Sequence, residues 1–223
     1  MKSAARPPRQ PAPALKAAQK AATHSAQEVR LIGGRWKRTP LPVPVVAGLR
    51  PTPSRVRETL FNWLGQDMGG WRVLDAFAGS GALGLEAASR GAESVRLIER
   101  EPQLVRALQA IKARLQADQV QIQQADAISW MRQHAGAGAF DLVFLDPPFD
   151  DDLFESALLA AAACVPEGGW VYLEAPHGYT DAVGTPQVQG LRLHRSGKAG
   201  AVHYHLFQRV GDASGISRVG QDV

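Results

Sequence analysis

The sequence predicts an α/β fold in which a seven-stranded, mostly parallel sheet carries helices on both faces. Three observations support this prediction. An apolar run that ends at Asp75 is followed by a glycine-rich turn and then by apolar residues at helical spacing. From there to residue 174, apolar segments of strand length alternate with segments of helical periodicity, as in βαβ units. The last two apolar segments are joined by a short turn, which predicts an antiparallel hairpin at the sheet edge.

The N-terminal quarter of the chain is strongly basic, whereas the rest is acidic. Residues 1–57 contain twelve Lys or Arg and one acidic residue, Glu28, although the whole chain has a net charge of only +4. A basic segment attached to an acidic body is expected when one end of a protein binds a polyanion, most often nucleic acid. The alternative, a solubilising tail, explains residues 1–26 better than residues 30–57.

We divide the chain into four parts. Residues 1–26 predict a disordered basic tail, because they contain no aromatic residue and little apolar periodicity. An organellar transit peptide is less favoured there, since several prolines oppose the amphipathic helix that it needs. We expect residues 27–66 to form a nucleic-acid-binding extension and residues 67–210 to form the catalytic domain. Residues 211–223 are expected to be a frayed tail.

The extension is expected to consist of a strand, a basic loop and a helix. The strand is predicted at 28–32, and it is followed by two glycines, the basic residues 35–38 and a proline-rich extended segment. The helix is expected to begin at Pro53, with Thr52 as its cap. Its apolar residues lie on one face, and Arg55 and Arg57 lie off that face, so the helix is expected to display arginines.

In the catalytic domain, strands are predicted at 72–75, 94–99, 120–124, 140–145 and 169–174, and later helices at 102–115, 127–134 and 152–164. The run at 140–145 is almost entirely apolar, which is typical of a central buried strand. The edge hairpin is predicted from strands at 191–195 and 201–209, with its turn at Gly197-Lys198-Ala199-Gly200.

Gly79, Gly81 and Gly84 follow Asp75 at a spacing that suits the floor of a nucleotide-type site. Glycines let the backbone turn sharply, approach a ligand and pack the next helix close to the strand. The spacing alone fits both a dinucleotide-binding dehydrogenase and an S-adenosylmethionine (SAM) methyltransferase. Asp75 favours SAM, because a carboxylate there repels a pyrophosphate, whereas SAM carries an ammonium and a sulfonium. The alternative is that Asp75 only caps the next helix.

Two more acidic residues end strands at the same predicted edge. Glu99 ends the second strand twenty residues after Gly79, where a carboxylate can accept both hydroxyls of a ribose. NAD enzymes share this arrangement, so Glu99 predicts a ribose without identifying the cofactor. Asp126 follows the third strand and can accept from an adenine amine. It can also cap the helix that begins at Ala127, and the two roles are compatible.

The sequence Asp146-Pro147-Pro148-Phe149 follows the central strand and indicates chemistry on the exocyclic amine of a nucleobase. Such an amine is a poor nucleophile, because its lone pair is delocalised into the ring. The Asp146 carboxylate and the Pro147 carbonyl can together accept both amine protons, and the prolines stiffen the turn. Phe149 offers a face on which a flipped base can stack. Alone, such a sequence is equally a simple turn; beside the glycine-rich loop and Glu99, the catalytic interpretation is favoured.

Together these motifs resemble a known family. Residues 75–92 with 146–149 look like the amino-methyltransferase branch of the Rossmann-like, class I SAM methyltransferases. Residues 48–52 and 55–64 are similar to the bacterial RsmD family, and the resemblance covers about Val29 to Arg209. Ser54 departs from the family's Arg-Pro-Thr-x-Asp pattern, which puts a local helix cap or RNA contact in doubt. Glu101 supplies the acid that the family commonly places two positions after the ribose-binding Glu.

The resemblance implies an enzyme that methylates N2 of one guanine in 16S ribosomal RNA, with SAM as cofactor. The expected partner is that RNA within the small ribosomal subunit or an assembly intermediate. The candidate catalytic residues are Asp146, Pro147, Pro148 and Phe149. The candidate cofactor-binding residues are Asp75, Phe77, Ala78, Gly79, Ser80, Gly81, Glu99 and Asp126. The candidate RNA-binding residues are Arg35, Lys37, Arg38, Arg50, Arg55, Arg57 and Lys198.

We also expect a monomeric, cytoplasmic protein that binds neither a metal nor a membrane. The single cysteine, Cys164, suits a reducing compartment, and no His or Cys cluster has the spacing of a metal site. The longest apolar run, at 157–165, is too short to span a bilayer.

Other functions share part of this pattern. An NAD-dependent oxidoreductase would use the same loop and Glu99, and an RNA-binding module without activity would keep the basic segment but has no use for residues 146–149. A methyltransferase acting on another RNA or DNA base amine, or on a protein glutamine, shares the tetrapeptide and is the hardest alternative to separate.

Overall fold

The computed structural model describes residues 28–44, 46, 51–136, 138–148, 153–179 and 190–211. Arg50 and Phe149, predicted to contact the substrate, lie outside these ranges. The predicted tails lie outside them as well, apart from Gly211.

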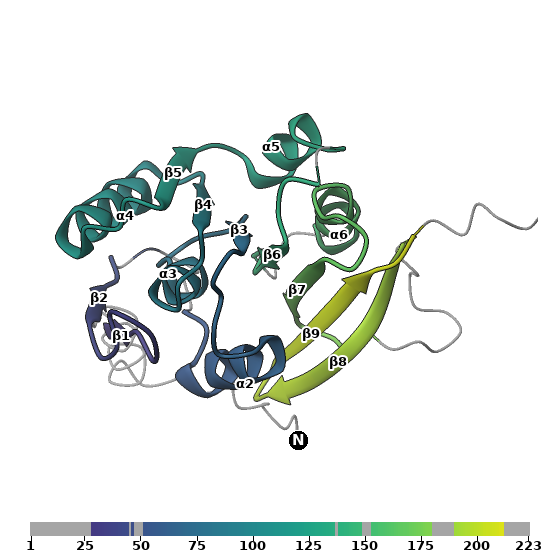
Figure 1. Cartoon of the computed structure of the whole chain (residues 1–223), viewed down its shortest axis with the longest axis horizontal. Coiled ribbons are helices and arrows are strands. Elements are labelled where there is room, and N and C mark those ends of the chain that lie inside the picture. Colours follow the sequence, from purple (N-terminus) through teal and green to yellow (C-terminus); the bar gives the residue numbers. More distant parts are fainter. Residues whose placement is uncertain are drawn as a thin grey trace, which may run out of the picture.

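A seven-stranded sheet forms the centre of the molecule, in the order β5-β4-β3-β6-β7-β9-β8 (Figure 1). The first five strands in this order are parallel, β9 runs antiparallel to β7, and β8 runs antiparallel to β9. The predicted sheet and edge hairpin are therefore confirmed. The strands are β3 (Arg72–Asp75), β4 (Ser94–Glu99), β5 (Val120–Gln124), β6 (Leu142–Leu145), β7 (Trp170–Ala175), β8 (Leu191–Ala199) and β9 (Val202–Arg209).

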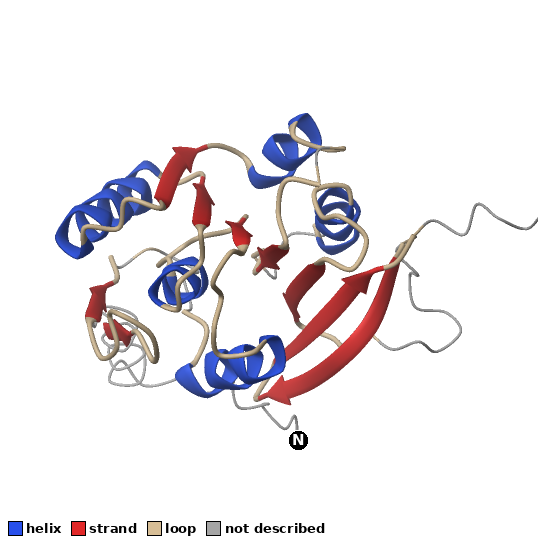
Figure 2. Cartoon of the chain, viewed as in Figure 1, coloured by secondary structure: helices blue, strands red, loops and turns tan. Residues whose placement is uncertain are grey.

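Helices cover both faces of the sheet (Figure 2). Alternate strand residues point to opposite faces. Val73 and Phe144 therefore join the core beneath α2, α3 and α4, whereas Leu74 and Val143 join the core beneath α5 and α6. No helix in the described ranges has the length and apolar run needed to cross a bilayer. The helices are α2 (Ser54–Leu64), α3 (Ala82–Ser89), α4 (Pro102–Leu115), α5 (Ala127–Gln133) and α6 (Phe154–Ala162).

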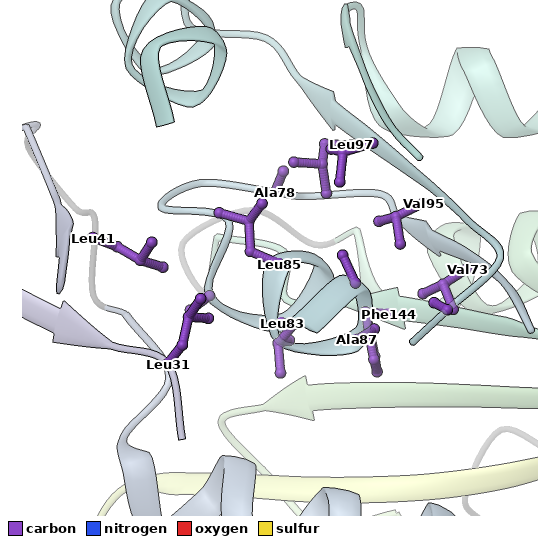
Figure 3. Packing of buried hydrophobic residues seen from close by; sticks show 14 of the residues in the cluster. Leu31, Leu41, Val73, Ala78, Leu83, Leu85, Ala87, Val95, Leu97 and Phe144 are labelled. Carbon is purple, nitrogen blue, oxygen red and sulfur yellow. The ribbon is translucent and has the colours of Figure 1, made fainter. Parts of the chain in front are cut away.

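The N-terminal extension shares one hydrophobic core with the sheet. Strands β1 (Glu28–Arg30) and β2 (Pro40–Pro42) form a small antiparallel pair, so the segment predicted only to be extended is a paired strand. Leu31 and Leu41 are buried in the same cluster as the leucines of α3 (Figure 3). The extension is therefore packed against the body of the protein.

Two local predictions are wrong. Helix α2 begins at Ser54 with Pro53 as its N-cap, and the Thr52 hydroxyl donates to the carboxylate of Glu174 instead of capping the helix. The hairpin turn lies at residues 200–201, because β8 continues to Ala199 before Gly200 takes up a left-handed conformation with φ of 61°. Lys198 is consequently an exposed strand residue.

Candidate active site

The glycine-rich turn joins β3 to α3 at the carboxyl ends of the parallel strands. The Gly81 amide donates to the Ala78 carbonyl at 2.6 Å, and Gly81 has a φ of 76°. This φ favours glycine, and a Cβ at Gly81 would lie 2.6 Å from the end of the Leu108 side chain, which would have to shift. The predicted tight turn is present, with Phe77, Ala78, Gly79 and Ser80 in it.

Asp75 lies at the end of β3 and is 2% exposed. Its Oδ2 accepts from the amide of Gly84 at 2.9 Å, so the helix-capping alternative is present in the structure. Burial, with smaller contributions from Glu99 and Glu174 and opposed by the Gly84 bond, raises the pKa of Asp75 to about 7. A cation beside this carboxylate would be stabilised by it, and the contact with SAM remains a prediction.

Glu99 connects the end of β4 to the glycine-rich turn. Its Oε2 accepts from the Gly79 amide and its Oε1 from the Glu101 amide, both at 2.8 Å. These two bonds hold the carboxylate in one orientation. Since an ionised carboxylate offers about four acceptor positions, both oxygens can still accept from the hydroxyls of a ribose.

Asp126 is the N-cap of α5. Its Oδ1 accepts from the Ser129 amide at 2.8 Å, and the bonds from Ser129 lower its pKa. The capping alternative is thus present here too. The second predicted role, accepting from an adenine amine, is compatible with this geometry and stays a prediction.

Asp146 immediately follows β6, with β3 on one side and β7 on the other. Burial raises the pKa of Asp146 well above its ordinary value, and the charges of Glu174 and Asp75 raise it further. Pro147 is buried and Pro148 is exposed. The chain therefore reaches the surface within two residues of the carboxylate. The structure brings Asp146 and Asp75 to one edge of the sheet, as predicted for a joint site.

Glu174 is a member of this acidic group that the sequence analysis did not identify. It is 3% exposed, and its Oε1 accepts from the Tyr172 hydroxyl at 3.0 Å. Burial raises its pKa, although hydrogen bonds from Thr52 and Tyr172 and the charge of Arg57 oppose the shift. Its sequence signal is an acid near the end of an apolar strand, the same signal that identified Asp75 and Glu99.

The prediction that Arg57 is displayed at the surface is wrong. Arg57 is 2% exposed, and its guanidinium donates to the carbonyls of Thr52 at 3.2 Å and Arg30 at 3.0 Å. It also forms an ion pair with Glu86 at 3.4 Å. The reason is that β1, α2 and α3 meet at this point. Arg57 therefore binds protein and not RNA.

Glu86 is the centre of this buried network. It is fully buried, and its carboxylate accepts from the amides of Ile32 and Gly33 at 2.8 Å each. It also pairs with Arg90 Nε at 2.9 Å as well as with Arg57. An acidic residue inside a short apolar helix gave no functional signal in the sequence. In the structure it attaches the N-terminal extension to α3.

In the described part of the N-terminal extension, the candidate RNA-binding residues that are exposed lie in two places. Arg35, Lys37 and Arg38 are exposed beside the carboxyl end of α3, where the Arg35 amide donates to the Ser89 carbonyl at 2.6 Å. Arg55 is exposed at the start of α2, three residues after Thr52. Because α3 begins at the glycine-rich turn and ends at Ser89, the basic loop lies about 12 Å, one length of this helix, from the strand ends.

An open depression of about 530 Å³ adjoins the basic loop and does not belong to the strand-end site. It lies against the carboxyl end of α4, on the side of the sheet where the parallel strands begin. One further cation, Lys112, lines it together with Arg35. It is lined by Arg35, Gln109, Lys112, Ala113, Gln116 and Asp118. Within the described ranges, no three His, Cys, Asp or Glu side chains are grouped as a metal site would require.

Known proteins are similar to this chain in sequence and in fold. A family model described as Conserved hypothetical protein 95 matches residues 29–208. The chain is 41% identical over 185 residues to ribosomal RNA small subunit methyltransferase D of Escherichia coli K12, a match that covers 82% of this chain and 90% of the relative. It is 37% identical over 187 residues to the protein of the same name from Haemophilus influenzae, covering 81% of this chain and 94% of the relative.

Among solved structures, the Escherichia coli protein yhhF has 38% sequence identity and a TM-score of 0.72 to this chain, and the match covers 83% of this chain and 100% of that one. The family model and the relatives all extend over most of the chain. The protein therefore belongs to the family described as Conserved hypothetical protein 95, the RsmD family that its sequence resembles.

Proposed function

We propose that this protein is a SAM-dependent methyltransferase that modifies the N2 amine of one guanine in 16S ribosomal RNA. The observation that carries the proposal is the position of Asp146 and Pro147 directly after the central strand, beside the glycine-rich turn and Asp75. Support for the RNA substrate comes from the names of the relatives, which are small-subunit ribosomal RNA methyltransferases. The basic extension agrees with an RNA substrate.

The residues at the strand ends suit a cationic cofactor. Asp75, Asp146 and Glu174 are carboxylates whose pKa values are raised by burial and, for the two aspartates, by other acidic groups of this edge. A positive charge nearby relieves this repulsion, whereas a pyrophosphate adds to it. Asp75, Glu99 and the amides of the turn are the groups that would hold SAM. When bound, SAM supplies a methyl group that is already activated by its sulfonium.

The chain's own contribution is then to orient the nucleophile. The Asp146 carboxylate and the Pro147 carbonyl accept the two protons of the amine, which directs the nitrogen lone pair away from them. The adjacent prolines hold these acceptors in place before the base arrives, so little reorganisation is needed at the moment of transfer. Phe149 is proposed to stack on the flipped guanine.

We expect SAM, and not NADH, to raise the melting temperature of the protein. A ligand that binds only the folded state, at 100 times its Kd, adds about 2.7 kcal/mol of stability. For a chain of this size this corresponds to an increase of about 5–10 °C. Differential scanning fluorimetry with each cofactor makes the measurement. Stabilisation by NADH alone would favour an oxidoreductase.

The basic loop is expected to contribute salt-dependent RNA affinity. Replacing both Arg35 and Lys37 with Gln should weaken binding and reduce the slope of log Kd against log salt by about 0.7–0.9 for each phosphate that is no longer neutralised. Fluorescence anisotropy at several salt concentrations measures this slope. The matched control replaces Arg106 and Arg132, which are exposed on α4 and α5, and should leave the slope unchanged. If the loop variant and the control variant gave the same slope of log Kd against log salt, the loop would be only a solubilising surface.

The proposed substrate is tested most directly with radiolabelled SAM and small subunits purified from cells that lack this protein. We expect one labelled nucleotide, a guanine methylated at N2, after digestion of the 16S RNA. Free 16S RNA and assembly intermediates in parallel reactions show which form is the substrate. Label in an adenine, in DNA or in a ribosomal protein would replace the proposed substrate with one of the alternatives.

A further inference from the structure

Glu174 lies beside Asp146 at the carboxyl ends of neighbouring strands. Leu145 of β6 is in register with Leu173 of β7, so the residues that follow them, Asp146 and Glu174, are adjacent. Two residues earlier on the same face, the rings of Phe144 and Tyr172 make an edge contact, with centroids 6.1 Å apart. Because side chains alternate along a strand, Asp146 and Glu174 point to this same face.

Burial raises the pKa of Glu174, and three neighbouring groups oppose this shift by stabilising its charged form. The Tyr172 hydroxyl donates to it at 3.0 Å, the Thr52 hydroxyl donates to it, and Arg57 contributes a positive charge from α2. At 3% exposure, Glu174 is inaccessible to a substrate as large as RNA. It therefore acts on the reaction only through its neighbours.

We propose that Glu174 is a positioning residue, which holds a negative charge beside Asp146 so that Asp146, and not water, accepts the proton that the methylated amine loses. This inference rests on the proposed function and names the proton acceptor of that reaction. Asp146 can serve as the acceptor because its carboxylate is also the group that holds the amine.

The charges balance in this step. The nitrogen lone pair forms the new N–C bond while the C–S bond breaks with its electron pair left on sulfur, and the nitrogen becomes positively charged. One N–H bond then breaks, its electron pair returns to nitrogen, and the proton moves to an oxygen of Asp146. The positive charge on sulfur and the negative charge of Asp146 are both lost. Once the cofactor is neutral, Asp146 therefore no longer adds to the repulsion between the neighbouring carboxylates.

The groups that act on Asp146 come from several elements. Asp75 of β3 and Glu174 of β7 are like charges that raise its pKa, together with burial. Glu99 of β4 acts on Asp75, and Arg57 of α2 acts on Glu174. Tyr172 is adjacent on β7, and Tyr204 of β9 is in register with Glu174. Because Asp146 must be ionised to accept a proton, the transfer rate should rise with pH through its raised pKa.

The test is the pH profile of the single-turnover rate, measured on small subunits with the full-length protein. Glu174→Gln keeps the shape and an acceptor for Tyr172 but removes the charge. We expect the acidic limb of its pH profile to move to lower pH and its plateau rate to fall by about tenfold, less than the roughly 10²–10⁴-fold contribution of a general base, because Asp146 itself is retained. SAM affinity should stay within about threefold, since the other contacts of the turn are intact. Glu174→Asp keeps the charge and should keep the limb close to that of the wild type.

If Glu174→Gln lowered the plateau rate but left the acidic limb of the pH profile in place, the role of Glu174 would be structural and the inference would be overturned. A fully active variant would overturn it as well. The wild type gives a test that needs no folded variant. A wild-type transfer rate that stays constant from about pH 9 down to about pH 5, close to the ordinary pKa of Asp, would also overturn the inference. Methylation of the expected guanine at neutral pH tests the proposed function separately, because it does not depend on the position of the limb.

Discussion

Asp146→Ala is expected to abolish methyl transfer, with a loss of about 10³-fold or more, while the Kd for SAM stays within a few-fold. The variant removes the acceptor that holds the amine and that takes up its proton, and positioning and preorganised electrostatics are the two contributions that this chemistry needs from the protein. Single-turnover transfer to small subunits and a SAM titration measure the two quantities.

The same variant should fold at least as well as the wild type. Asp146, which is half-buried, adds a like charge beside the buried Asp75 and Glu174, and its removal relieves that repulsion. Asp118→Ala, at an exposed aspartate on the opposite edge of the sheet, is the matched control and should have full activity. Wild-type rates in Asp146→Ala would remove Asp146 from the mechanism, and a large loss of SAM affinity would place it in the cofactor site instead.

Glu86→Ala is expected to lower the free energy of unfolding by about 3–5 kcal/mol. It leaves the buried guanidiniums of Arg57 and Arg90 without their shared carboxylate, and breaking a buried ion pair from one side has a cost of this size. The amides of Ile32 and Gly33 lose their acceptor as well. The loss is a large part of the stability of an ordinary domain.

Urea unfolding followed by circular dichroism measures this change. Glu86→Gln, which keeps the acceptor oxygen but not the charge, should show a smaller loss. The control is Glu93→Ala, at an exposed glutamate shortly after α3, where a change within about 0.5 kcal/mol is expected. An unfolding free energy equal to that of wild type in Glu86→Ala would mean that the network contributes nothing to attaching the extension.

The acidic edge of the sheet was largely predictable, because its residues are identified by local position. Asp75, Glu99 and Asp146 each end or directly follow an apolar strand, and parallel strands bring their carboxyl ends to one edge. What could not be predicted is the hydrogen bonding of each carboxylate. Asp75 caps α3 and Asp126 caps α5, in addition to any contact with a ligand.

The basic extension shows where local patterns are insufficient. Arg57 lies off the apolar face of α2, which predicts exposure, but it is buried because β1 and α3 also pack against that helix. Periodicity shows which side of a helix is apolar and contains no information about a third element that covers the polar side. Arg55, only two residues away, is exposed as predicted.

The sequence by itself determined the seven-stranded sheet with its edge hairpin, the glycine-rich turn and the strand-end carboxylates, because strand periodicity and turn chemistry act over a few neighbouring residues. Only the tertiary structure decided that Glu174 lies beside Asp146 and that Glu86 joins residues more than fifty positions apart. The physical reason is that a buried charge is retained only where partners from distant elements converge on it, and that convergence is a property of packing.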